Sequence, residues 1–130
     1  PTAKSWREIA RPAAPVTPAP VDQAAADATT LREIEQLADA GQLREARRRA
    51  EAQVEARGAS APLLFLLGVV ADASGDQARA EEMFRKVIYL DPRHTEALGH
   101  LATRAELNGD LRAARSFRER AQRALEREAQ

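Results

Sequence analysis

The sequence predicts an all-α fold: a right-handed α-solenoid of three helix hairpins that follows a Pro/Ala-rich N-terminal arm. Three observations carry this prediction. Apolar residues recur at helical spacing from residue 30 onward, and no alternating strand pattern appears. Gly41, Gly75 and Gly109 interrupt the helical pattern at a constant interval of 34 residues, so each marks the turn of one hairpin.

A 34-residue period of helix–turn–helix units is typical of tetratricopeptide repeats. The middle unit fits their motif best, because Gly68 and Ala80 are small where two helices of a hairpin cross and Phe84 fills the space beside them. Pro92 ends the second helix, since the residue before a proline disfavours the α conformation. We therefore expect a domain of residues 30–130 with repeats at about 30–57, 62–90 and 95–128.

The N-terminal part has a different composition. Residues 12–29 hold four of the seven prolines and no aromatic residue, which predicts an extended linker. Residues 1–11 form an arm with the capping pattern of a short helix, and such a helix is marginal alone. Two alternatives remain for this arm: it is disordered, or it is a helix that docks through Trp6 and Ile9.

The repeats carry recognisable local signals. Thr30 followed by Glu33 predicts a capping box at the start of the first helix. Glutamates that precede a cation by four residues predict ion pairs on solvated helix faces. These pairs are Glu45–Arg49, Glu81–Arg85 and Glu82–Lys86.

The helix expected from Leu63 is apolar around its whole circumference, so it should be buried on all sides. One stripe of this helix faces its hairpin partner, and other stripes meet the neighbouring units. The predicted core comprises Leu64, Leu67, Gly68, Ala71, Ala80, Phe84, Val87, Leu98, Leu101, Ala105 and Ala114.

A binding groove is expected from the resemblance to tetratricopeptide proteins, in which the first helix of each unit lines the concave face. Only Arg32 stands where a cation could hold a peptide carboxylate, so recognition of a charged C-terminus is not expected. The candidate groove residues are Phe65, Leu66, Val69, His100, Thr103 and Glu106.

Composition excludes several functions. The chain has no cysteine, hence no disulfide and no thiolate zinc site, and its 20 cations balance 20 carboxylates, so no basic surplus favours nucleic acid. No nucleophile, phosphate loop or metal-binding motif appears, so we expect no catalytic residue, cofactor or metal in this chain. The apolar run is too short to span a bilayer, and a cytoplasmic protein is expected. The chain starts at Pro1, which suggests a piece of a longer protein.

Residues 65–110, FLLGVVADASGDQARAEEMFRKVIYLDPRHTEALGHLATRAELNGD, resemble the C-terminal repeat module of CheR-type chemoreceptor methyltransferases of the biofilm-associated, Wsp-type form. The resemblance implies an S-adenosylmethionine-dependent protein-glutamate methyltransferase domain before this chain. The repeats would then regulate or target that enzyme in chemosensory signalling and biofilm formation. The alternative is a stand-alone adaptor in envelope or pilus assembly.

The expected partner is a protein: a chemoreceptor, a signalling protein or the chain's own arm, with a homodimer by arm exchange as a further option. Neither nucleic acid nor a membrane span is expected.

Overall fold

The computed structural model describes residues 20–130 of the chain. The predicted arm with Trp6 and Ile9, and the linker up to residue 19, lie outside the described residues. The chain divides into two units, Pro1–Thr30 and Leu31–Gln130, which are considered separately.

The first helix, α2 (Pro20–Asp39), begins ten residues before the predicted start. Thr30 lies inside this helix and donates a hydrogen bond from Oγ1 to the carbonyl oxygen of Ala26 at 3.1 Å, so the predicted capping box is wrong. The extended-linker prediction for residues 20–29 is also wrong. The last proline of the linker stands at position 20, and the alanine-rich stretch after it has high helix propensity.

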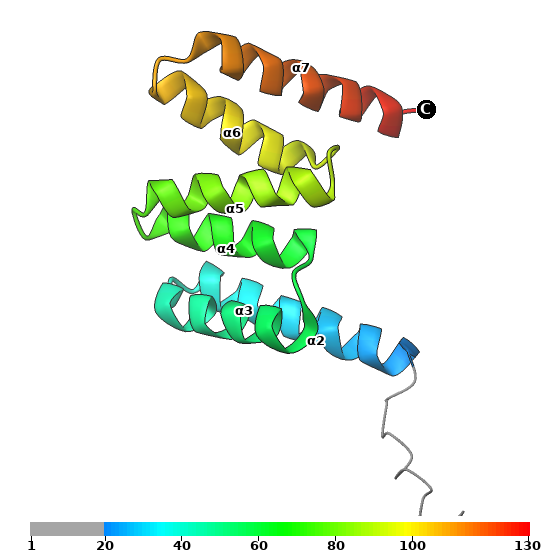
Figure 1. Ribbon diagram of the computed structural model, residues 1–130. Coiled ribbons are helices and arrows are strands. Elements are labelled where there is room, and N and C mark those ends of the chain that lie inside the picture. The colour runs from blue at the N-terminus through cyan, green and yellow to red at the C-terminus, as the bar shows by residue number, and fades with distance from the viewer. Residues whose placement is uncertain (1–19) are drawn as a thin grey trace, which may run out of the picture. The chain divides into compact units, whose positions relative to one another are not determined.

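Residues 31–130 contain the rest of α2 and five further helices, and no strand is present in the described part of the chain. Helices adjacent in sequence lie side by side from α3 to α7, so the hairpins stack in chain order (Figure 1). The all-α prediction is confirmed, and the stacking is consistent with an α-solenoid. The helices after α2 are α3 (Leu43–Arg57), α4 (Ala61–Ala73), α5 (Gln77–Leu90), α6 (Thr95–Leu107) and α7 (Leu111–Glu128).

The three turns within the hairpins use the same chemistry. Gly41, Gly75 and Gly109 adopt φ values of 77°, 84° and 79°, and residues that have a Cβ rarely adopt such positive φ values. The aspartates that follow two of them, Asp76 and Asp110, cap the next helix by accepting a hydrogen bond from the backbone N–H three residues on, at 3.2 and 3.1 Å. The residue after Gly41 makes no side-chain cap.

Helix α4 is buried on most of its circumference, as its sequence predicts. It contacts α3 on one side and α5 on the other, so its apolar stripes are covered by two neighbours. Ser60 caps the start of this helix through a 3.4 Å hydrogen bond from the Leu63 N–H. Its buried residues are Leu63, Leu64, Leu66, Leu67, Gly68, Val70 and Ala71.

The predicted core is confirmed at every position except Ala105, which is only half-buried. The prediction missed much of the first hairpin and the contacts between hairpins, because it followed the motif positions of the middle repeat. The additional buried residues are Ile34, Ala46, Ala50, Leu63, Leu66, Val70, Met83, Ala97, Ala102, Phe117 and Ala124.

The predicted ion pair between Glu45 and Arg49 is wrong. Arg49 instead contacts Glu33 of α2, with Nη2 and Oε2 2.6 Å apart, and thereby connects the two helices of the first hairpin. Glu45 faces Arg48 at 3.7 Å. The other two predicted pairs form, Glu81–Arg85 at 3.0 Å and Glu82–Lys86 at 3.3 Å.

We predict that Gly68→Ala destabilises the protein. A Cβ at this position would lie 2.6 Å from Cε1 of Phe84, whose ring is fully buried. The free energy of unfolding, measured by urea denaturation, should fall by about 1–3 kcal/mol because the packed ring must shift.

The matched control is Gly99→Ala on α6, where a Cβ would meet no atom within 4 Å. This change should raise the free energy of unfolding by roughly 0.5–1 kcal/mol, since alanine is the better helix former. Equal effects of the two substitutions would show that α4 and α5 do not approach closely at Gly68.

Candidate functional site

Two neighbouring clefts are lined mainly by the first helices of the hairpins. The first cleft, of about 320 Å³, lies between the C-terminal part of α2, the first turns of α4 and the start of α6. Its floor is apolar and its edge carries carboxylates. The lining residues are Glu35, Ala38, Asp39, Pro62, Phe65, Leu66, Val69, His94 and Glu96.

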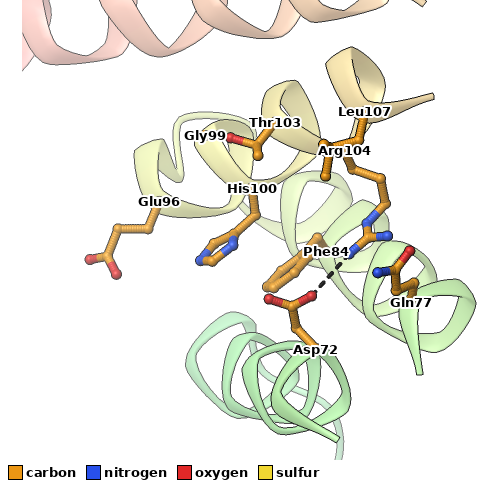
Figure 2. Close-up of a pocket in the computed structure, with 9 residues that line it drawn as sticks. All are labelled: Asp72, Gln77, Phe84, Glu96, Gly99, His100, Thr103, Arg104 and Leu107. Carbon is orange, nitrogen blue, oxygen red and sulfur yellow. Dashed lines mark hydrogen bonds and ion pairs between the residues drawn. The ribbon is translucent and has the colours of Figure 1, made fainter. Parts of the chain in front are cut away.

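The second cleft, of about 570 Å³, is lined by residues of α6 together with α4 and α5 (Figure 2). Glu96 lines both clefts, so we treat them together as one groove. The residues of the second cleft are Asp72, Gln77, Phe84, Glu96, Gly99, His100, Thr103, Arg104 and Leu107.

Most of the candidate groove residues line this groove. The three apolar candidates of α4 (Phe65, Leu66 and Val69) belong to the first cleft, and His100 and Thr103 belong to the second. The sixth candidate, Glu106, lines neither cleft because its carboxylate binds the Arg118 guanidinium of α7. Ligand binding by these residues stays a prediction.

Four of the side chains that line the groove are rings, and they form a cluster. The Phe65 ring centroid lies 5.6 Å from that of Phe84, 4.8 Å from His94 and 5.7 Å from His100. The rings of Phe84 and His100 stack in parallel, 4.5 Å apart and inclined by 9°. The cluster therefore links α4, α5 and α6, and it connects the floor of the groove to the core.

His94 has a structural role that the sequence did not reveal. It is the N-cap of α6, where Nδ1 accepts a hydrogen bond from the backbone N–H of Ala97 at 3.1 Å. This bond satisfies one of the backbone N–H groups that have no partner within the first turn of α6. Histidine is not among the preferred N-cap residues, which is why the sequence pattern indicated only a turn.

Arg104 crosses the second cleft to reach α4. Its Nη2 lies 3.0 Å from Oδ1 of Asp72, and its side chain is only 11% exposed (Figure 2). The pair holds α6 against α4 at one end of the groove and neutralises the two charges. Sequence patterns did not predict this ion pair, because its two residues lie 32 positions apart on different helices.

The carboxylates of the first cleft have no such partner. Glu35, Asp39 and Glu96 are exposed, and none of them forms an ion pair within the described residues. No lysine or arginine lines this cleft. Its edge is therefore negatively charged above an apolar floor.

A second charged surface lies between the turn that joins α5 to α6 and the C-terminal half of α7. There Arg93, Arg120, Arg123 and Arg127 line a shallow cleft of about 230 Å³, with Pro92 and Ala124 between them. We call it the arginine cleft. No acidic residue lines it.

No group of three or more metal-binding side chains comes together in residues 20–130. None of the helices that the structure describes combines the length and the apolar character needed to cross a membrane.

No family model matches the chain. The chain is 42% identical over 113 residues to a protein of Pseudomonas aeruginosa PAO1 named probable biofilm formation methyltransferase WspC, a match that covers 87% of this chain and 27% of the relative. A protein of the same name from Pseudomonas putida KT2440 is 40% identical over 94 residues, which is 72% of this chain and 22% of the relative. The chain thus spans about a quarter of the length of these curated relatives, and the resemblance to Wsp-type methyltransferases is confirmed.

We predict that Glu106 titrates below its usual range. The hydrogen bond from Arg118, aided by the charge of that guanidinium, lowers the pKa of Glu106. Since the folded pKa is lowered, the stabilisation by this pair is present above the pKa of glutamate in the unfolded chain. It is lost as the pH falls through the lowered folded value.

Arg118→Gln should therefore raise the pKa of Glu106 towards the ordinary value of an exposed glutamate, as measured by NMR titration of the side-chain carboxyl carbon. Arg123→Gln on the same helix is the control and should leave this pKa unchanged, because Arg123 lines the arginine cleft and not the Glu106 contact. An identical Glu106 titration with and without the Arg118 guanidinium would contradict the assignment.

Proposed function

Because the chain belongs with the WspC-type biofilm formation methyltransferases over the segment that they share, we propose that it is the protein-interaction module of such an enzyme. The parent protein is then an S-adenosylmethionine-dependent methyltransferase that modifies glutamates of chemoreceptors in the cytoplasm. The module regulates or targets this activity in chemosensory signalling and biofilm formation.

We assign the three hairpins to the tetratricopeptide class. The support is the repeated turn chemistry: glycines with positive φ spaced by 34 residues, with Asp76 and Asp110 capping the helices that follow two of them. The close crossing at Gly68, filled by Phe84, agrees with the motif as well.

We assign methyl transfer to a part of the parent protein outside this chain. The relatives that carry the methyltransferase name are about four times as long as the segment that they share with it. None of the sequence motifs expected of the methyltransferase domain occurs in these 130 residues.

The observation that carries the interaction role is the groove of two clefts along the first helices of the hairpins. Such a groove presents an apolar floor and polar edges to an extended or helical segment of another protein. A stack of hairpins is well suited to this task, because each hairpin adds one segment to a continuous surface.

We predict that the chain alone does not bind S-adenosylmethionine in isothermal titration calorimetry. In the full-length parent protein, deletion of residues 30–130 should lower receptor methylation in cells or the localisation of the enzyme. The remaining catalytic domain should still bind S-adenosylmethionine, and this is the control for its folding.

Micromolar binding of S-adenosylmethionine by the chain alone would contradict the assignment of methyl transfer to another part of the parent protein. If the deletion left both methylation and localisation untouched, the interaction role would be wrong. A parent protein with no methyltransferase domain would instead favour a stand-alone adaptor.

A further inference from the structure

We infer that the segment bound in the groove is basic and carries an apolar anchor that packs against Phe65. This inference rests on the proposed function and adds the chemistry of the partner. It follows from three properties of the groove: its apolar floor, its uncompensated charge and the distribution of charge over the rest of the chain.

The floor of the first cleft offers apolar surface to a ligand. Phe65 and Val69 are only partly buried although most of α4 is fully buried, and Pro62 lines the same cleft. The Phe65 ring contacts the rings of Phe84 and His94, at centroid distances of 5.6 and 4.8 Å, and these contacts restrict its movement before a ligand binds. A leucine or aromatic side chain placed here would remove this surface from water without requiring the floor to rearrange.

The charge of the groove is negative. Four carboxylates (Glu35, Asp39, Asp72 and Glu96) and the guanidinium of Arg104 line the two clefts, which leaves a formal charge of minus three. The Arg104–Asp72 pair is internally neutral, and His94 and His100 are occupied as a helix cap and in a ring stack. The charge therefore resides on the three carboxylates that have no partner among the described residues.

These three carboxylates lie on both sides of the floor. Two come from α2 and Glu96 comes from α6, with Phe65 of α4 in the same cleft. A ligand that places its anchor on Phe65 would bring its flanking side chains to these carboxylates. Lysine or arginine at those positions is attracted, and an arginine can also stack on the ring face, whereas aspartate or glutamate is repelled.

The rest of the chain makes this charge significant. The protein has no net charge, yet four carboxylates and a single guanidinium line the groove, whereas four arginines and no carboxylate line the arginine cleft. An acidic ligand would thus find a better site in the arginine cleft than in the groove. The two surfaces can be tested against each other.

The chain's own residues 4–11 share part of this chemistry, with three cations around Trp6 and Ile9. Glu8 lies among them, however, and would bring a further carboxylate to an acidic edge. A foreign segment with several cations and no carboxylate matches the groove better. Occupation by the chain's own segment is therefore an alternative outcome of the test.

The test uses the full chain and two fluorescent peptides that share their leucine anchors and differ only in carrying lysine or glutamate. Fluorescence anisotropy should show that the lysine peptide binds at least about tenfold more tightly than the glutamate peptide. Its affinity should fall as salt is added, since part of the attraction is between exposed charges.

A charge-reversed variant localises the binding. Glu35→Lys combined with Glu96→Lys should weaken the lysine peptide by about tenfold or more. The matched control, Glu55→Lys combined with Glu128→Lys, changes the net charge equally at exposed positions outside the groove and should preserve the affinity. Thermal unfolding followed by circular dichroism verifies that both variants fold.

Four results would overturn the inference. The first is that the glutamate peptide binds as tightly as the lysine peptide or more tightly. The second is that the groove variant and its control variant lose the same amount of affinity for the lysine peptide. The third is binding that disappears only in Arg123→Glu combined with Arg127→Glu, which would assign the ligand to the arginine cleft. The fourth is Trp6 emission that is blue-shifted without peptide and moves to the red only in the groove variant, which would assign the groove to the chain's own segment.

These outcomes are distinguishable from a failure of the proposed function. If deletion of the repeats impairs the parent enzyme but the peptide preference is reversed, the module still mediates interactions and only the partner's chemistry is wrong.

Discussion

The close approach of α4 and α5 at Gly68 is the contact on which the rest of the structure depends. Because Gly68 has no side chain, the ring of Phe84 can lie directly against the backbone of α4. From this position the ring stacks on His100 of α6 and contacts Phe65 on the groove side. The absence of a side chain at Gly68 thus allows Phe84 to pack at once against α4, against the next hairpin and against the floor of the groove.

Sequence periodicity predicted the helices, the turns and about half of the core, since these features are determined by spacing along one chain. The 34-residue interval located Gly41, Gly75 and Gly109, and the unbroken apolar run predicted the burial of α4. The start of α2 was predicted too late. The prolines up to Pro20 indicated a linker, but the alanines that follow Pro20 favour a helix.

The parts of the site that the sequence did not predict depend on contacts between helices. Arg49 lies four residues after Glu45, but a glutamate on the neighbouring helix provides its contact instead. Glu106 has the spacing of a groove residue, yet Arg118 draws its carboxylate towards α7. Five of the six candidate groove residues line the groove, whereas the acidic edge around Phe65 was not anticipated, because its carboxylates come from α2 and α6.

The protein is thus a stack of hairpins with an acidic, apolar-floored groove, within a segment shared with WspC-type methyltransferases. Binding of a basic segment in this groove is most directly tested by mapping ¹H–¹⁵N chemical shifts while the full chain is titrated with the lysine–leucine peptide. We expect perturbations at Phe65, Val69, Gly99 and Thr103, which lie along the groove. Perturbations confined to the arginine cleft, or none at all, would contradict it.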